Sequence, residues 1–343
     1  MKIEKNCSLL PYNTFGIDQK CDELWTYEST EEAAEAAMAL QGREFLILGG
    51  GSNLLLTKDY HGIVITPSSN SYTIEKTDAD ADHVDVRVWS GATFDEIVAL
   101  TLASGLYGLE NLSLIPGEVG ASAVQNIGAY GAEAKDVIRN IEAVEIASGN
   151  VVTINAEDCD YSYRQSRFKH EWKNRYLITH VTYRLSRTFR PHLDYGNIRK
   201  ELERQNISEA TLTGEQLRQV ICDIRRAKLP DPAVTGNAGS FFMNPIVDKA
   251  TFDRLLTEHP DLRYFEVKED SETRYKIPAG WMIDQCGWKG KSLGRAGVHD
   301  KQALVLVNRG GATGEDIVRL MEAIQHDVKT HFGLDIYPEV NII

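Results

Sequence analysis

Three polar residues stand in sequence contexts suited to proton transfer or charge stabilisation. Strand alternation in Tyr161–Lys169 would place Arg164 on the face that carries Phe168, half buried and available to a developing anion. Ser240 lies between a glycine and two phenylalanines, so its hydroxyl could end in a dry pocket and donate a proton. Glu339 is the only charge among the last eight residues. Each also has a structural interpretation, as a surface strand, a turn cap or a strand edge that faces water.

Two glycine-rich runs indicate main chain that a ligand can approach closely. Phe45–Asn53 is an apolar segment that opens into three glycines, and Ser113–Gly131 carries four more at positions 117, 120, 128 and 131. Glycine permits positive φ, so such runs can turn their N–H groups toward phosphate oxygens. The runs contain neither a Walker A loop nor the G-x-G-x-x-G spacing. Two of them favour a cofactor with a long diphosphate over one small anion, with purely structural loops as the alternative.

Composition narrows the class of protein. The chain has 343 residues, of which 42% are hydrophobic and 25% charged, as in globular domains, and its formal net charge is −13. This charge argues against nucleic acid or an anionic membrane surface as the main partner. An anionic substrate would need a local basic pocket, for which Arg225–Lys228 and Lys289–Lys291 with Arg295 are candidates; a solvated charge run is the alternative for each.

The sequence also sets expectations for location and metal content. No apolar run approaches about 18 residues, and the first residues lack the apolar core of a signal peptide, so we expect a cytoplasmic protein. The five cysteines are scattered without a C-x-x-C pair, which predicts reduced thiols. The nine histidines form no ligand-spaced cluster, so we expect no metal.

Periodicity predicts a mixed α+β chain. A helix capped by Ser29 and closed by Gly42 lies between strands at 24–27 and 45–48. A strand at 84–89 leads into a helix capped by Thr93, and three antiparallel strands follow at 141–146, 151–154 and 176–185.

A Pro/Gly-rich break at 228–239 predicts a domain boundary. Beyond it we expect a smaller α/β domain, with helices at 250–258 and 316–329, the second capped by Thr313 and stopped by Gly333, and a strand at 303–308. Asp335–Ile343 reads as a strand that groups Glu339 with Tyr337 and Asn341 on one face.

Short motifs occur in order across the whole chain, as Asn13-Thr-Phe15, Gly49-Gly-Gly-Ser-Asn53, Ile115-Pro-Gly117, Gln125-Asn-Ile-Gly-Ala-Tyr-Gly131, Tyr163-Arg-Gln-Ser-Arg-Phe-Lys169, Lys228-Leu-Pro230, Gly236-Asn-Ala-Gly-Ser-Phe-Phe242, Ala279-Gly-Trp-Met-Ile283 and Pro338-Glu-Val340. Together they resemble the motifs of the UDP-N-acetylenolpyruvoylglucosamine reductase family. The segment Asp194-Tyr-Gly196 is similar to the tyrosine loop that closes over substrate in the long form of that family.

The resemblance implies a fold and a division into domains. The fold would be the two-subdomain FAD-binding fold of vanillyl-alcohol oxidase-type flavoproteins, with a smaller α/β substrate-binding domain. We expect a first FAD subdomain at 1–70, rejoined by a C-terminal strand at 334–343, a second at 71–225, and the substrate domain at 230–333.

The resemblance also implies the chemistry. NADPH would reduce a non-covalent FAD and leave, and hydride would pass from the flavin to the vinyl terminus of UDP-N-acetylglucosamine enolpyruvate, in peptidoglycan precursor synthesis. The protein would act as a monomer without nucleic acid or membrane. The cofactor would contact Gly49, Gly50, Gly51, Ser52, Asn53, Ile115, Pro116, Gly117, Gly120, Gln125, Asn126, Gly128, Ala129 and Tyr130.

Roles for individual residues follow from the same resemblance. Arg164 would stabilise the anionic intermediate, Glu339 would polarise its carboxylate group as a protonated acid, and Ser240 would deliver the proton to carbon. The substrate diphosphate would be held by Tyr195, Arg225, Lys228 and Asn244. Two departures concern affinity and not the type of reaction: Met243 stands where many relatives carry lysine, and Ala121–Val124 lacks the proline of the long form.

Two other functions remain as alternatives. One is a flavin oxidoreductase of the same fold that acts on a hydroxy acid or an alcohol, which would leave Ser240 and Glu339 without a purpose. The other is a nucleotide-sugar binding protein without flavin, against which the intact glycine runs argue.

Overall fold

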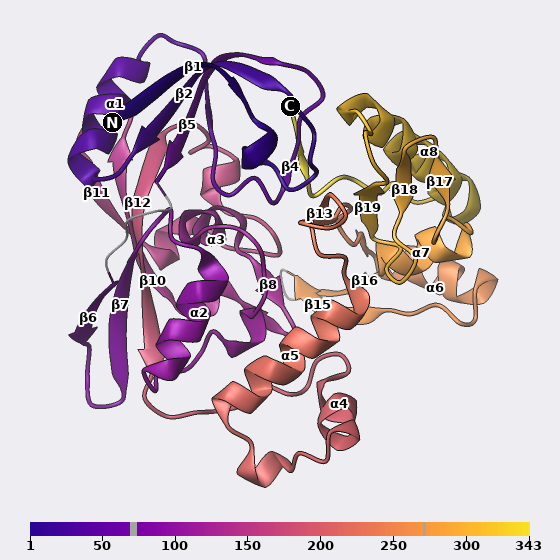
Figure 1. Ribbon diagram of the computed structural model, residues 1–343. Coiled ribbons are helices and arrows are strands. Elements are labelled where there is room, and N and C mark those ends of the chain that lie inside the picture. Colours follow the sequence, from indigo (N-terminus) through magenta and orange to yellow (C-terminus); the bar gives the residue numbers. More distant parts are fainter. Residues whose placement is uncertain (69–73, 270–271) are drawn as a thin grey trace. The chain divides into compact units, whose positions relative to one another are not determined.

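The computed structural model describes residues 1–68, 74–269 and 272–343, and these residues form two compact units. The first unit comprises Met1–Ser8, Lys20–Gly51 and Tyr60–Ala227, and the second Leu9–Gln19, Ser52–Asp59 and Lys228–Ile343 (Figure 1). The boundary expected at residues 70–71 lies outside the described residues. The three-domain division stays a prediction.

The first sheet of unit 1 has the strand order β1-β2-β5-β3. Its strands are β1 (Lys2–Ser8), β2 (Lys20–Tyr27), β5 (Tyr60–Pro67) and β3 (Phe45–Ile47), and β5 is parallel to both of its neighbours. Helix α1 (Thr30–Leu40) is alanine-rich, and Ala33, Ala36, Ala37 and Leu40 form its buried face. The Ser29 hydroxyl accepts a hydrogen bond from the Glu32 N–H at 3.2 Å, as its predicted cap position requires.

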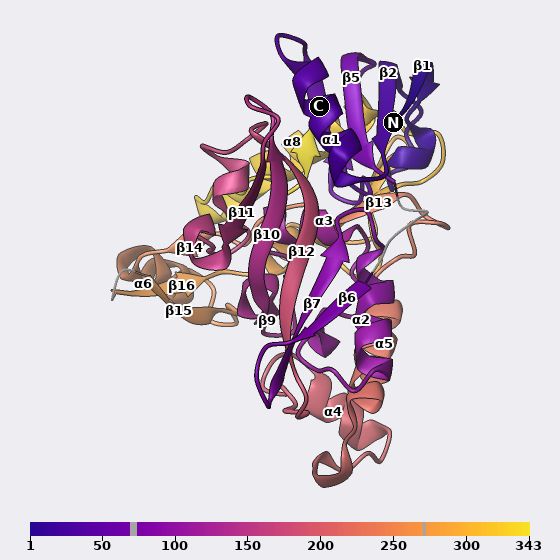
Figure 2. The same ribbon diagram turned by 90° about the vertical axis from the view of Figure 1, so that its left-hand side faces the viewer.

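The second sheet of unit 1 is antiparallel with the order β11-β10-β12-β7-β6, which Figure 2 shows. Its strands are β6 (Ile74–Asp78), β7 (His83–Trp89), β10 (Ile138–Glu145), β11 (Val151–Asn155) and β12 (Tyr176–Ser186), so the antiparallel strands expected from the sequence are confirmed. Helices α2 (Phe94–Ala103) and α3 (Val119–Gln125) and the short strands β8 (Gly128–Ala129) and β9 (Ala132–Glu133) follow β7. Thr93 stands at the start of α2, but its side chain caps no N–H there, contrary to the prediction.

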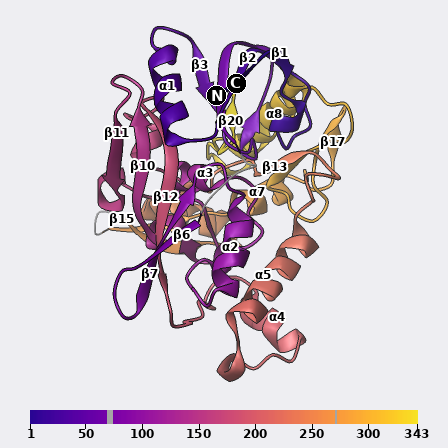
Figure 3. The same cartoon turned by 60° about the vertical axis from the view of Figure 1, so that its left-hand side comes forward.

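Two further helices complete unit 1, α4 (Ile198–Arg204) and α5 (Gly214–Lys228), whose last residue is assigned to unit 2. They lie side by side in Figures 1 and 3 and share a small core of their own. Its buried members are Leu193, Ile198, Leu202, Leu212, Leu217, Val220, Ile221 and Ile224. An ion pair with two close contacts between Arg218 and Asp95 joins α5 to α2.

Unit 2 is built on a four-stranded sheet, a three-stranded sheet and a two-stranded pair. The first has the order β13-β19-β18-β17, and the second β14-β16-β15. The strands are β4 (Leu54–Leu55), β13 (Asn237–Ser240), β14 (Ile246–Val247), β15 (Phe265–Glu269), β16 (Glu272–Lys276), β17 (Ser292–Leu293), β18 (Ala296–Val298), β19 (Val305–Asn308) and β20 (Asn341–Ile342). The helices are α6 (Lys249–Glu258), α7 (Ala279–Gln285) and α8 (Gly314–Phe332).

Helix α8 confirms both of its predicted ends. Thr313 and Asp316 form a reciprocal capping box, and Gly333 ends the helix with φ 67°. The apolar face of the helix is buried, with Ile317, Leu320 and Ile324 inaccessible to solvent. This face packs in the core of unit 2 together with Phe241 and Phe242.

Two predicted strands are wrong in extent. Residues 161–169 form a tight turn followed by a helical turn, because Ser162 and Gln165 exchange main-chain hydrogen bonds and close the chain on itself. Only Asn341–Ile342 of the C-terminal segment is a strand, and it pairs in parallel with β4. Ile336 and Val340 are buried and Tyr337 is exposed, but Ile342 is exposed too, so the predicted alternation holds only for part of the segment.

Candidate active site

The two glycine-rich runs meet in unit 1. A Cβ atom on Gly50 would lie 3.2 Å from the Cα of Gly117, and a Cβ on Gly49 would lie 3.6 Å from that of Ala121. Main chain approaches main chain here only because neither residue at the contact carries a side chain. Nothing in the spacing of the two runs predicted that they would touch, and their role in holding a cofactor stays a prediction.

Arg164 lies against the second run. It occupies the turn at 162–165 with φ 58°, and its Nη2 donates to the Gly128 carbonyl at 2.6 Å. A Cβ on Gly128 would approach Arg164 Nη1 to 2.8 Å, so the glycine makes room for the guanidinium. The guanidinium also lies 5.2 Å from the centre of the Tyr163 ring. Arg164 is half-buried, as predicted, but a turn and not a strand positions it.

The tyrosine loop lies at the far end of the same run. Asp194–Asn197 is a turn with φ 71° at Gly196, and a Cβ on Gly131 would come within 3.1 Å of the Tyr195 Cβ. Asn111 fixes this meeting point, because its amide donates to the carbonyls of Tyr130 at 2.8 Å and His192 at 2.9 Å.

Arg225 of α5 interacts electrostatically with Tyr130 at this end of the run. Its guanidinium is largely buried, Nε has no hydrogen-bond partner among the described residues, and burial lowers the pKa of the group. Tyr130 is among the groups that partly offset this shift, while burial raises the pKa of Tyr130 itself. A buried N–H donor without an acceptor is costly, so the Arg225 guanidinium is suited to an anionic ligand.

Two residues expected at the cofactor use their polar groups internally. The Asn126 amide donates to Glu133 Oε2 at 3.0 Å and to the Ser162 carbonyl at 2.9 Å, and its oxygen accepts from Lys135 N at 3.0 Å. The Gly120 N–H donates to the Ser90 carbonyl at 2.8 Å. Both hold the second run in place and do not present those groups to a ligand.

Replacing Asn126 with alanine is expected to lower the free energy of unfolding of the apoprotein by about 3 kcal/mol, because three buried hydrogen bonds are lost and their partners remain. The φ of 44° at this position adds strain for alanine. Urea unfolding of the apoprotein measures the change. The exposed Asn155, whose side chain caps nothing, is the matched control, for which we expect a change within about 0.5 kcal/mol. Equal effects of the two substitutions would contradict this role.

Unit 2 brings Ser240 and Glu339 together. Ser240 is the last residue of β13 and pairs with Val305 of β19. The carbonyl of the next residue, Phe241, accepts a hydrogen bond from the Glu339 N–H at 2.8 Å. Phe241 and Phe242 are fully buried and anchor this stretch. The Ser240 side chain itself is exposed, so the dry pocket expected from its aromatic neighbours is not formed by unit 2; both aromatic rings turn into the core.

The remaining predicted residues of unit 2 have mixed surroundings. Asn53 donates its amide to the Glu339 carbonyl at 3.2 Å, which links the glycine-loop segment to the C-terminal segment. The side-chain oxygen of Asn244 accepts a hydrogen bond at 2.9 Å from the N–H of Ala279, the first residue of α7. Lys228 is exposed at the end of α5. In the second basic cluster, Lys289 pairs with Asp284 at 3.1 Å, which fits a solvated charge run.

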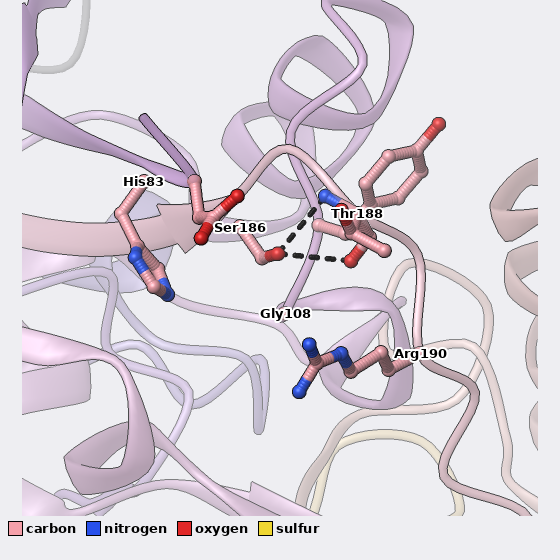
Figure 4. Close-up of a pocket in the computed structure, with 7 residues that line it drawn as sticks. His83, Gly108, Ser186, Thr188 and Arg190 are labelled. Atoms are coloured by element: carbon pink, nitrogen blue, oxygen red, sulfur yellow. Dashed lines mark hydrogen bonds between the residues drawn. The ribbon is translucent and has the colours of Figure 1, made fainter. Parts of the chain in front are cut away.

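A pocket in unit 1 lies apart from all the predicted residues. It is lined by Asp82, His83, Tyr107, Gly108, Ser186, Thr188 and Arg190, and Figure 4 shows Ser186 and Thr188 hydrogen-bonded to each other. The Ser186 hydroxyl donates to the Thr188 carbonyl, and the His83 ring pairs with Asp80. These two polar side chains of the lining therefore already have partners within the protein.

Within residues 1–68, 74–269 and 272–343, no group of three or more His, Cys, Asp or Glu side chains is arranged to hold a metal ion. No helix in this part of the chain is both long and apolar enough to cross a bilayer.

Comparison with known proteins identifies the family. Residues 25–155 match the FAD binding domain family, and residues 231–343 match the UDP-N-acetylenolpyruvoylglucosamine reductase C-terminal domain. The chain is 49% identical to UDP-N-acetylenolpyruvoylglucosamine reductase of Bacteroides fragilis over 99% of its own length and 100% of the relative's. The chain belongs to the UDP-N-acetylenolpyruvoylglucosamine reductase family. It is an FAD-dependent oxidoreductase.

Other members of the reductase family agree with this assignment. The enzyme of Pseudomonas aeruginosa is 47% identical over 100% of this chain and 99% of its own. The crystal structure of the reductase from Thermus caldophilus covers 100% of this chain and 99% of that chain with a TM-score of 0.68, at 23% identity. The predicted fold class, a two-part FAD-binding fold with a smaller α/β domain, is confirmed by these matches.

The residues at the meeting of the glycine runs fit the FAD that this family binds. Gly50 and Gly117 leave bare main chain on both sides, which suits the diphosphate of a dinucleotide. The sequence analysis missed one residue here, Glu118, whose buried Oε2 has no hydrogen-bond partner among the described residues. The sequence does single out Glu118, because it is the only charged residue in Ser113–Gly131.

Proposed function

We propose that this protein reduces UDP-N-acetylglucosamine enolpyruvate to UDP-N-acetylmuramate with NADPH as the electron donor, in the cytoplasmic synthesis of peptidoglycan precursors that supports cell shape and division. The observation that carries the proposal is the full-length relation to reductases of this name. The protein would act as a monomer, without nucleic acid or membrane as a partner. Bound FAD supplies hydride transfer; the substrate double bond takes up one hydride and one proton.

The protein residues would handle the charge and the proton. The carbon that bears the substrate carboxylate becomes negative when hydride adds to the vinyl terminus. Arg164, whose guanidinium lies beside Gly128, would stabilise that charge, and Ser240 would protonate the carbon. A free serine hydroxyl is a weak acid, so Ser240 would depend on neighbouring cations to act as a donor. Glu339, held next to Phe241 by its main chain, would polarise the carboxylate end by hydrogen bonding.

The substrate diphosphate would be held by Tyr195, Arg225, Lys228 and Asn244. Arg225 has the clearest support, because its buried guanidinium retains an unpartnered Nε–H. Asn244 would bind through its amide nitrogen, since its oxygen accepts from Ala279.

Turnover of the purified holoenzyme tests the assignment. Incubated with UDP-N-acetylglucosamine enolpyruvate, the protein should oxidise NADPH and form one product that is heavier by two hydrogen atoms, in equal amounts. An oxidoreductase for a hydroxy acid or an alcohol would not consume this substrate. Mass spectrometry of the nucleotide fraction separates these two results.

Glu339→Ala is expected to lower kcat by about 10²–10³, because a group that polarises the reacting end of the substrate is lost. Glu339→Gln should retain much more activity, since glutamine keeps a hydrogen-bond donor of similar shape. Neither change removes the Glu339 N–H bond to Phe241, so the fold should persist. Steady-state assays with Glu322→Gln on the exposed face of α8 provide the control. An equal loss of activity in the alanine and glutamine variants would instead indicate that Glu339 acts through its negative charge.

A further inference from the structure

The Glu118 carboxyl lies between the two glycine-rich runs. Its Oε2 would be 3.4 Å from a Cβ on Gly49, and its Cγ 3.5 Å from a Cβ on Gly50. Oε2 is inaccessible to solvent and accepts no hydrogen bond within the described part of the chain. The Glu118 side chain does not cap α3, which begins at the next residue. A buried carboxyl oxygen is therefore held without a hydrogen-bond partner from the described residues, at the place where the residues fit a diphosphate.

Among the described residues, no cation contributes to the pKa shift of this carboxyl. Tyr27 of β2 is a titratable group that interacts electrostatically with it, and the Ser90 side chain, just after β7, lies beside the Tyr27 hydroxyl. Burial raises the pKa of Tyr27 above its usual range, so its phenol remains neutral wherever Glu118 titrates. Gly49, Gly50 and Ala121 of the adjoining runs carry no charge. Burial is the cause that raises the pKa of Glu118, to about 8.

An ionised carboxylate at this position would repel the phosphate oxygens of a dinucleotide, because like charges at short range in a buried site repel strongly. A neutral carboxylic acid has the opposite effect, since it donates an O–H to a phosphate oxygen, and charged acceptors make the stronger hydrogen bonds. We propose that Glu118 binds the cofactor as a neutral acid, donating its proton to an oxygen of the FAD diphosphate, so that cofactor binding takes up a proton at alkaline pH. The inference rests on FAD binding and not on the substrate assignments.

The pH dependence follows from this linkage. Below about pH 8 the acid is already protonated, so the affinity for FAD should not change with pH. Above it, apoprotein must first take up a proton to bind, so the dissociation constant should rise by about tenfold per pH unit. The direction is the same for folding: a carboxyl with a raised pKa makes the apoprotein less stable as pH rises from 4.5 to about 8.

FAD titration of the apoprotein, followed by flavin fluorescence from about pH 6 to about pH 9.5, measures this linkage. The wild type should show the tenfold slope above about pH 8, and ADP, which carries the diphosphate without the flavin, should show it too. Glu118→Gln should bind FAD with a flat profile, because glutamine donates a hydrogen bond without titrating. Calorimetry of the wild type in buffers of different ionisation enthalpy should detect proton uptake at alkaline pH.

Controls separate the proposal from other causes. Glu44→Gln, an exposed glutamate just before β3, should keep the wild-type slope. Riboflavin, which lacks phosphate, should bind without this dependence of the dissociation constant on pH. A flat wild-type profile with no proton uptake, the same slope in Glu118→Gln, or an equal slope with riboflavin would each overturn the proposal.

Discussion

Ser240→Ala is expected to slow reoxidation of the reduced flavin by UDP-N-acetylglucosamine enolpyruvate by about 10²–10⁴ while leaving reduction by NADPH unchanged, because only the reoxidation consumes the proton that Ser240 would supply. The substitution removes one oxygen from an exposed position at the end of β13, so the pairing with β19 should persist. Stopped-flow absorbance under anaerobic conditions measures each half-reaction separately.

Ser292 provides a matched control for this experiment. It is an exposed serine at the start of β17, in the same four-stranded sheet as Ser240, and Ser292→Ala should leave both rates unchanged. Equal slowing of the two half-reactions in Ser240→Ala would contradict a role in proton delivery and indicate damage to the flavin site.

Arg164→Met is expected to reduce the same reoxidation rate by about 10²–10³, because the developing charge on the substrate loses its cation. Arg164→Lys should fall between the methionine variant and the wild type, since lysine keeps the charge but loses the planar fork. Both variants lose the 2.6 Å hydrogen bond from the guanidinium to the Gly128 carbonyl. A difference in reoxidation rate between them would therefore report the effect of the positive charge and not the anchoring of the turn.

The control for Arg164 lies three residues away. Arg167 pairs with Glu171 at 2.9 Å on the protein surface, and Arg167→Met should change neither half-reaction. If Arg164→Lys and Arg164→Met were equally slow and equally unstable to heat, the residue would serve the turn alone and its catalytic role would be refuted.

Much of the fold could be predicted from local signals. Ser29, Thr313 and Gly333 marked helix ends that the structure confirms, because capping depends on a few neighbouring residues. The segment around Arg164 was predicted wrongly as a strand, since Ser-Tyr-Arg-Gln alternates like one, whereas main-chain bonds between Ser162 and Gln165 make it a turn. Periodicity does not reveal such closure.

The candidate site could be predicted less completely. The glycine runs showed where main chain is bare, but only the structure shows that Gly50 meets Gly117. Polar groups of Asn126 and Gly120 bond to protein partners distant in sequence, which the sequence does not reveal, and the contact of these two residues with the cofactor stays a prediction. Glu118 was missed because an acid beside a phosphate site is unfavourable unless it is protonated, and burial sets its protonation.

The most direct test of the proposed reaction is an anaerobic titration of the holoenzyme followed by flavin absorbance. NADPH should bleach the flavin, and UDP-N-acetylglucosamine enolpyruvate added next should restore the oxidised spectrum with one equivalent of substrate consumed. Bleaching without recovery would leave a flavoprotein and contradict the proposed substrate. A colourless protein that FAD cannot reconstitute would contradict the enzyme itself.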